Sequence, residues 1–282
     1  MLEPTATLRA PKAGARDDRP LALVLRAAGT NCDSEAVEAL ERAGARAERV
    51  HIAELARKPA QIDGASIVLI PGGFSYGDYV AAGRLFGREL RQRLGDALER
   101  HVERGGFVLG ICNGFQVLVE LGLLEGPDAE GNRRGDDART LALVDNSSGR
   151  FECRWIHLRS EPSVCPLLVP GEIWPVPVAH GEGRLVVAST ERLEELRARG
   201  QIALRYVRAD GSPAEYPEQP NGSLEAIAGL CDPTGRVLGL MPHPERNQRP
   251  WSHPRWTRLG PREEGEGLAL FHRLVSAATA AR

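Results

Sequence analysis

FVLGICNGFQVLVEL, residues 107–121, joins a short apolar run to a longer apolar segment through a turn that glycines flank. The run Phe107–Ile111 is typical of a strand that is buried on both faces of a parallel sheet. The segment Asn113–Leu121 has the length and residue types of a helix. This strand–turn–helix unit predicts an α/β fold in which the turn lies at the carboxyl end of a strand.

The turn itself has the pattern of a nucleophile elbow. Gly110 and Gly114 stand two residues on either side of Cys112, where larger side chains would collide with the sharp bend. The start of the following helix favours a thiolate at Cys112, and the N–H of Asn113 is placed to donate to an oxyanion. The alternative is a buried structural cysteine beside a tight turn.

The rest of the first half repeats the alternation of strands and helices. Strands are expected at Leu21–Arg26, Ala47–Ile52 and Ser66–Ile70, and a long amphipathic helix at Leu85–Glu103. This order predicts a mostly parallel central sheet flanked by helices.

The second half differs, because its strand candidates are short and closely spaced, which favours additional antiparallel strands. Two polar stretches, 126–139 and 212–222, are expected to be surface loops, and a final helix is expected at 264–280. The strand candidates are Leu141–Asp145, Phe151–Arg159, Val176–His180, Arg184–Ala188, Ile202–Val207, Leu224–Cys231 and Val237–Met241.

The composition argues against nucleic-acid-binding and membrane-spanning proteins. The 282 residues carry 36 basic and 38 acidic side chains, a net charge of -2, which argues against a nucleic-acid partner. No apolar run approaches the roughly 20 residues of a membrane helix, and five cysteines suit a reducing, cytoplasmic location. Residues 1–20 are expected to be a mobile N-terminal extension, and residues 21–282 a single domain.

A thiol nucleophile needs a base, and His243 is the best candidate. It follows the last predicted strand between two prolines, which restrict where its imidazole points. Glu245, two residues later, can accept the second ring N–H and fix the tautomer. Taken alone, the pair is better explained by a loop histidine and a solvated carboxylate, but taken together with the elbow at Cys112 it is not.

The turn after the strand Ser66–Ile70 is a candidate for a second oxyanion donor. Gly72 and Gly73 allow backbone N–H groups to approach a ligand closely. A plain loop turn would have the same sequence, so this segment is weak evidence by itself.

At this point six segments together resemble a known family, over about residues 21–258. They resemble the glutaminase subunits of phosphoribosylformylglycinamidine synthases, which are class I, triad-type glutamine amidotransferases with a flavodoxin-like sheet. The segments are LRAAGTNCDSE (25–35), IPGGFSYGDY (70–79), GICNGFQVL (110–118), NSSGRFECRW (146–155), AHGEGR (179–184) and MPHPERNQRPW (241–251).

The resemblance implies a catalytic role for five residues. Cys112 would attack the glutamine carboxamide, His243 would act as base and then as acid, and Glu245 would orient the imidazole. Gly73 and Asn113 would donate to the oxyanion. No metal site is implied, and the other four cysteines are expected to be dispensable for the chemistry.

The resemblance also implies a substrate site. Gln116, together with Asn146, Ser147 and Phe151, would hold the amino-acid end of L-glutamine. His180, in AHGEGR, is similar to a family position near the synthase partner.

Partners and cofactors follow from the same resemblance. The chain would supply ammonia to a synthase subunit, with a small accessory subunit as a further candidate partner. ATP and Mg would bind to the synthase subunit and no cofactor to this chain, in which no G-x-x-x-x-G-K-[ST] motif occurs.

The rim around Phe74, Tyr76 and Tyr79 is the expected docking surface for the synthase, unless these aromatics pack under their loop. Small residues at 80–83 replace an arginine that relatives often carry there.

Three other functions compete with this one. An amidotransferase that feeds a different synthase would share the triad but not GGFSYGD and AHGEGR. A cysteine hydrolase or peptidase would not explain Gln116 and the loop after Asn146. A non-enzymatic binding module would have no reason to keep Cys112, His243 and Glu245 together.

Overall fold

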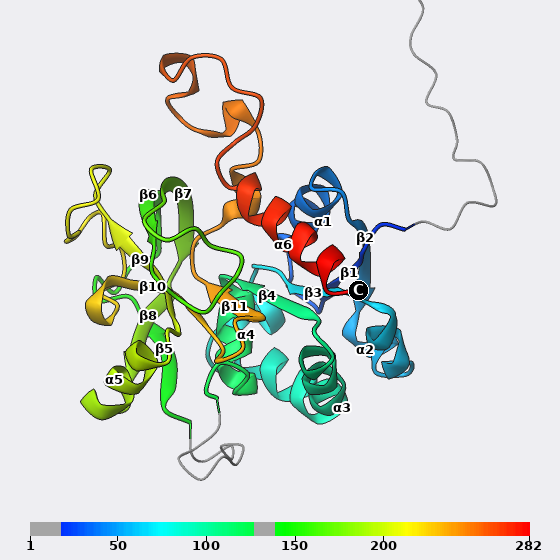
Figure 1. Cartoon of the computed structure of the whole chain (residues 1–282). Helices are drawn as coiled ribbons and strands as arrows, with labels where there is room; N and C mark the ends of the chain where they lie inside the picture. The colour runs from blue at the N-terminus through cyan, green and yellow to red at the C-terminus, as the bar shows by residue number, and fades with distance from the viewer. Residues whose placement is uncertain (1–17, 127–138) are drawn as a thin grey trace, which may run out of the picture.

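The computed structural model describes residues 18–126 and 139–282 (Figure 1). The predicted extension, residues 1–20, lies outside this part of the chain except for its last three residues. The predicted loop 126–139 also lies outside it, except for its two ends. Most strands belong to one nine-stranded sheet with the order β2-β1-β3-β4-β11-β10-β9-β6-β7.

One half of this sheet is parallel. Its two central strands, β3 and β4, are buried along their whole length, as expected of apolar runs covered on both faces. The five parallel strands are β2 (Arg46–His51), β1 (Leu21–Arg26), β3 (Ile67–Ile70), β4 (Phe107–Ile111) and β11 (Val237–Leu240).

The other half is antiparallel, and a separate two-stranded antiparallel sheet pairs β5 with β8. The predicted fold class, a mostly parallel sheet with antiparallel additions in the second half, is therefore confirmed. The strands of this half are β10 (Ile227–Cys231), β9 (Ile202–Val207), β6 (Glu152–Ser160) and β7 (Ile173–His180), and the small sheet consists of β5 (Leu141–Asp145) and β8 (Glu182–Val187).

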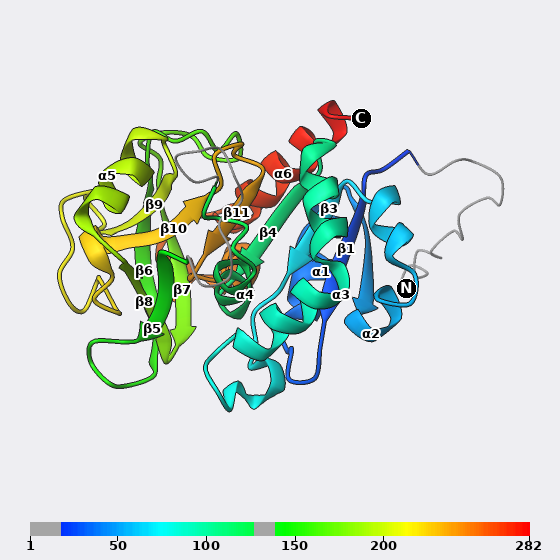
Figure 2. The ribbon, with the colours of Figure 1, turned by 90° about the horizontal axis from the view of Figure 1, so that it is seen from below.

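Helices cover both faces of the parallel half. Helices α1 (Asp33–Arg42) and α6 (Leu268–Ala280) lie over one face, and α3 (Arg84–Glu103) and α4 (Asn113–Leu121) over the other (Figure 1). Seen from below, α3 lies in front of the parallel strands (Figure 2). A short helix, α2 (Ile52–Leu55), follows β2.

The sequence did not predict α5 (Thr190–Ala198). Ser189 caps this helix by accepting a hydrogen bond from the Arg192 N–H. Only Leu193 and Leu196 supply buried apolar side chains, so the helix lacks the apolar stripe by which amphipathic helices are found.

The register of the parallel strands gathers three chain segments at one edge. Ile70 of β3 pairs with Gly110 of β4, and Ile111 of β4 pairs with Leu240 of β11. The segments that follow these strands therefore leave the sheet side by side. The sheet also curls, since the Pro177 carbonyl of β7 accepts a hydrogen bond of 2.9 Å from the His243 N–H.

Two further expectations concern the chain as a whole. Among the described residues, none of the helices combines the length and the apolarity that crossing a bilayer requires. Nine strands that lie between Leu21 and Leu240 share one sheet, but the single domain proposed for residues 21–282 stays a prediction.

Candidate active site

Cys112 lies on a strained turn between β4 and α4. Its backbone adopts φ 54° and ψ −107°, a region that costs a residue with a side chain about 1–3 kcal/mol. A Cβ at Gly110 would lie 2.6 Å from the Gly114 carbonyl oxygen, and one at Gly114 would lie 1.9 Å from the Ile70 carbonyl oxygen. Both flanking positions therefore require glycine, as the elbow pattern predicted.

His243 and Glu245 form a buried pair beside this turn. His243 Nδ1 lies 2.6 Å from Glu245 Oε1, and each residue is only 1% exposed. Burial alone would lower the pKa of His243, but the Glu245 carboxylate and the Cys112 sulfur outweigh burial and raise this pKa well above its ordinary value. The pair therefore favours the protonated imidazolium form of His243 beside Cys112.

The Cys112 sulfur is aimed along the edge of β7. Cys112 Sγ lies 3.6 Å from the Ala179 carbonyl oxygen, and His243 Nε2 has no hydrogen-bond partner within the described part of the chain. The hydrogen bond between a catalytic nucleophile and its base is often long without substrate and shortens when substrate binds.

The glycine loop after β3 lies directly against the triad. A Cβ at Gly72 would come within 2.8 Å of His243 Cε1 and 3.4 Å of Cys112 Cβ. Gly73, with φ 146°, lines the same small cavity as Cys112. The loop is thus placed where an oxyanion donor is needed, and the roles of Gly73 and Asn113 stay predictions.

The side chains of Asn113 and Gln116 join the elbow to neighbouring segments. Asn113 Nδ2 donates to Gln116 Oε1 at 2.9 Å, and Asn113 Oδ1 accepts from the Ser75 N–H at 3.3 Å. Gln116 Nε2 donates to the Glu182 carbonyl oxygen. Gln116 lines the cavity, and its predicted role in holding the substrate stays a prediction.

The loop 146–151 is only partly at the cavity. Phe151 lines it, whereas Ser147 is exposed and Asn146 is buried behind His180, with Asn146 Oδ1 lying 3.0 Å from His180 Nδ1. Asn146 therefore supports a residue of the cavity wall rather than forming the wall. His180, expected near a partner, is 3% exposed and lines the cavity itself.

The cavity beside Cys112 has a volume of about 110 Å³ and two acidic residues that the sequence did not single out. Asp78 reaches it from the loop after β3, and Glu182 from the first position of β8. Burial and the nearby Glu182 raise the pKa of Asp78 to about 6. Asp78 lies in the quoted segment IPGGFSYGDY and Glu182 in AHGEGR, and membership of these segments was the available signal.

Cys32 also lies at the triad, although the sequence gave it no role. Arg246 Nη2 lies 3.0 Å from Cys32 Sγ, and ligand atoms of Cys32, His243 and Glu245 lie within 4.8 Å of one another. This set has metal-ligand chemistry, but the Arg246 cation already occupies one side of the sulfur and opposes a second cation. The group therefore fits the triad better than a metal centre, and the predicted absence of a metal stays a prediction.

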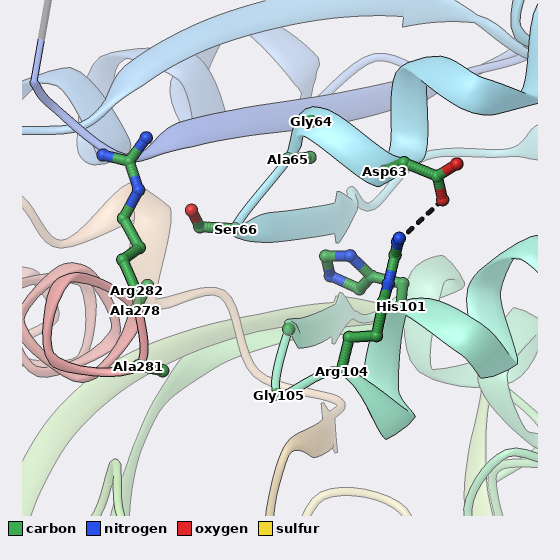
Figure 3. A pocket seen from close by; sticks show the side chains of 11 residues that line it. Asp63, Gly64, Ala65, Ser66, His101, Arg104, Gly105, Ala278, Ala281 and Arg282 are labelled. Carbon is green, nitrogen blue, oxygen red and sulfur yellow. Dashed lines mark hydrogen bonds and ion pairs between the residues drawn. The ribbon is translucent and has the colours of Figure 1, made fainter.

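Larger cavities lie away from this chemistry. A cavity of about 380 Å³ is lined by Ser66 and Gly106, which precede β3 and β4, so it lies at the opposite edge of the sheet (Figure 3). Its charged side chains are already engaged, since Arg104 pairs with Asp63 at 2.7 Å and Arg282 donates to the Asp18 carbonyl oxygen at 2.8 Å. Ser66 and His101 also line it, but His101 Nε2 already lies 3.2 Å from the Phe107 carbonyl oxygen and no cysteine lines this cavity, so the small cavity at Cys112 is the candidate active site.

Comparisons with known proteins show the family to which the chain belongs. The family model described as a CobB/CobQ-like glutamine amidotransferase domain matches residues 19–276. The phosphoribosylformylglycinamidine synthase subunit PurQ of Dehalococcoides mccartyi is 44% identical over 255 residues, which cover 90% of this chain and 95% of that protein. The subunit of the same name from Treponema denticola is 46% identical over 240 residues, covering 81% and 88% of the two chains.

A solved structure shares both fold and sequence with the chain. The structure of PurLQS from Thermotoga maritima contains a chain that is 33% identical, with a TM-score of 0.67. The match covers 92% of this chain and 98% of that one.

Proposed function

The chain belongs to the CobB/CobQ-like glutamine amidotransferase family, and we propose that it is the glutaminase subunit of a phosphoribosylformylglycinamidine synthase. The observation that carries the proposal is the placement of Cys112 on a strained elbow beside the buried His243–Glu245 pair. Relatives at 44% and 46% identity carry the name of this synthase's PurQ subunit. The family and the triad geometry thus support the same activity.

The chemistry follows from the residues around Cys112. The thiolate attacks the carboxamide carbon of L-glutamine, and the N–H groups of Gly73 and Asn113 stabilise the tetrahedral oxyanion. When the C–N bond breaks, His243 gives its proton to the departing ammonia and a glutamyl thioester remains on Cys112. His243 then takes a proton from water, which attacks the thioester and releases glutamate. Glu245 holds the imidazole in the required tautomer.

The ammonia is consumed by a partner. The synthase subunit uses ATP to convert formylglycinamide ribotide to formylglycinamidine ribotide in purine synthesis. The related structure from Thermotoga maritima is a PurLQS assembly, which supports a synthase subunit and a small accessory subunit as partners of this chain. ATP and Mg bind to the synthase subunit, this chain holds no cofactor, and the complex works in the cytoplasm.

An amidotransferase for another synthase is the strongest competing function. It is disfavoured because the close relatives that cover 81–90% of the chain share one synthase name. A cysteine peptidase is disfavoured because the cavity of about 110 Å³ is too small for an extended peptide.

Docking of the synthase is proposed to activate the site. The loop after β3 carries consecutive left-handed residues, Tyr76 (φ 55°), Gly77 (φ 69°) and Asp78 (φ 52°), and such strain is found where loops switch. Phe74 and Tyr79 are 46% and 89% exposed and form an open rim for a partner. Tyr76 instead packs under the loop, with its hydroxyl on Glu89 and its ring against Phe86.

The test is a glutaminase assay of the chain alone and with its candidate synthase. Glutamine turnover should be weak alone and should rise at least about 10-fold when the synthase and accessory subunits, the ribotide and ATP are added, since one misplaced oxyanion donor costs about 10² in rate. Full turnover by the isolated chain would contradict the activation step and leave the triad intact. Turnover in neither condition would contradict the function itself.

A further inference from the structure

The segment that joins the triad to α6 projects from the body of the molecule. It consists of residues 249–262, which we call the arginine loop, and it extends beyond α6 in orange (Figure 1). The loop carries four arginines and no aspartate or glutamate, although the whole chain has a net charge of -2. The rest of the chain therefore has more acidic than basic side chains, and the loop is a local positive patch.

Two of these arginines, Arg255 and Arg258, have no acidic partner. Both are exposed, and within residues 18–126 and 139–282 neither forms an ion pair. Glu264, which follows the loop, pairs with His272 instead. The two cations are therefore available to the carboxylates of another molecule.

Large apolar side chains lie beside these cations. Trp251 and Trp256 are 59% and 50% exposed, and Leu259 is 45% exposed. Two of the four tryptophans of the chain thus face solvent on one short loop. Tryptophan and arginine are the residues that most often dominate the binding free energy of protein interfaces, and burial of the apolar side chains is favourable in itself.

The arginine loop is held firmly at its base. Arg249 pairs with Glu38 of α1, and Arg262 pairs with Glu266. Three prolines within the loop restrict its backbone further. A surface that is ordered before binding loses less conformational entropy when a partner docks.

A groove of about 650 Å³ lies between this loop and the antiparallel half of the sheet. Trp155 of β6, Ile173 of β7 and Leu259 of the loop supply apolar parts of its wall. Among the described residues that line the groove, Arg255 and Glu218 are charged and form no ion pair. The groove thus offers a partner an apolar pocket with a free arginine at its border.

Charge decides which partner fits this surface. A two-fold contact between copies of the chain would use the same patch twice, and the arginines would then repel one another. A nucleic acid is disfavoured, because a chain with a net charge of -2 lacks the excess of cations that a phosphate backbone requires. A folded protein whose carboxylates surround an apolar side chain complements both the arginines and the groove.

We propose that the arginine loop is an anchor on which the synthase subunit docks through an acidic patch, with the two unpaired arginines facing carboxylates and the tryptophans buried in the contact. The inference rests on the proposed glutaminase function. It adds a contact outside the active-site rim of Phe74 and Tyr79. Because the loop begins shortly after Glu245 in the chain, this anchor is continuous with the segment that carries the triad.

The test measures how tightly the full chain binds its synthase subunit. The double variant Arg255→Glu, Arg258→Glu should raise the Kd by about 10²-fold, and Trp256→Ala should raise it by about 10-fold. The matched control is Arg57→Glu, Lys58→Glu, which makes the same change of charge at exposed positions after α2 and should bind as the wild type does. The association rate of the wild-type chain should fall as salt rises, and that of the double variant should depend less on salt.

Activity measurements separate docking from chemistry. The double variant should need about 10²-fold more synthase subunit for half-maximal formation of the amidine from glutamine, and should reach the wild-type maximum within about twofold. A diazo-ketone analogue of glutamine should label Cys112 of the isolated double variant at the wild-type rate, because neither arginine lines the cavity beside Cys112.

The other outcomes are equally informative. An unchanged Kd for the double variant, or an equal loss of binding by the control, would overturn the proposal and leave the glutaminase function standing. Binding of single-stranded RNA that the double variant loses, with the Kd for the synthase unchanged, would assign the loop to a nucleic acid and overturn the proposal. A dimer of the isolated chain that the double variant dissolves, again with that Kd unchanged, would assign it to a second copy. If the wild-type chain neither binds the synthase nor supports amidine formation, the proposed function fails together with the inference.

Discussion

Replacing Gly72 by alanine tests the geometry of the site with one methyl group. The Gly72 backbone is not left-handed, so alanine adds no backbone strain there. Its Cβ would lie 2.8 Å from His243 Cε1, 3.2 Å from Cys32 Sγ and 3.4 Å from Cys112 Cβ. The methyl group would therefore enter the triad itself.

The size of the effect follows from these distances. Carbon atoms prefer about 3.5 Å or more, so His243 must move by about 0.7 Å away from the new methyl group. A displacement near 1 Å costs a positioned catalytic group about 10² in rate. We expect glutamine turnover to fall by about 10- to 10²-fold, while the fold loses only about 1–3 kcal/mol of stability through overpacking.

The assay measures kcat for glutamine in the assembled complex, and thermal unfolding of the same protein. Gly64→Ala is the control, because a Cβ at Gly64 meets nothing within 4 Å, and it should keep the wild-type rate. Wild-type kcat in folded Gly72→Ala protein would refute the placement of His243 and Cys112 around this loop.

Further predictions concern the members of the triad and its neighbours. His243→Ala should lower glutamine turnover by about 10²- to 10⁴-fold and Glu245→Gln by less, as steady-state kinetics can measure. Glu245 raises the pKa of His243, so Glu245→Gln should lower that pKa. In a pH profile of the Cys112 labelling rate, the alkaline limb should then move to lower pH. An unmoved limb would contradict the pairing of His243 with Glu245. Cys32→Ala should lower glutamine turnover, since it removes the sulfur between Arg246 and His243. Cys153→Ala, at an exposed position, is the control and should not lower it. Equal turnover rates for the two variants would support the sequence-based expectation that both cysteines are dispensable.

Much of the fold follows from local sequence. Buried parallel strands are continuous apolar runs, and for this reason Leu21–Arg26 and Phe107–Ile111 were predicted with the bounds that the structure has. The elbow was equally predictable from the sequence, because close backbone contacts require glycine at positions 110 and 114. Parallel strand ends share one edge, and this places His243 near Cys112 without further information.

Other features depend on contacts between distant parts of the chain. The return of β7 to the site brings Ala179 and His180 to Cys112, and no local pattern encodes how far an antiparallel half curls. Cys32 follows β1, two strands from β4 in the sheet, so its position at the same edge was predictable. Its contacts with Arg246 and His243 were not, because they depend on side-chain packing.

The central claim is that Cys112 releases ammonia from glutamine for a synthase partner. The direct measurement is product formation by the complex that contains Cys112→Ala, with glutamine or with ammonium chloride as the nitrogen source. We predict that glutamine-dependent formation of the amidine is lost while ammonia-dependent formation stays at the wild-type level. Glutamine-dependent formation near the wild-type rate would contradict the account.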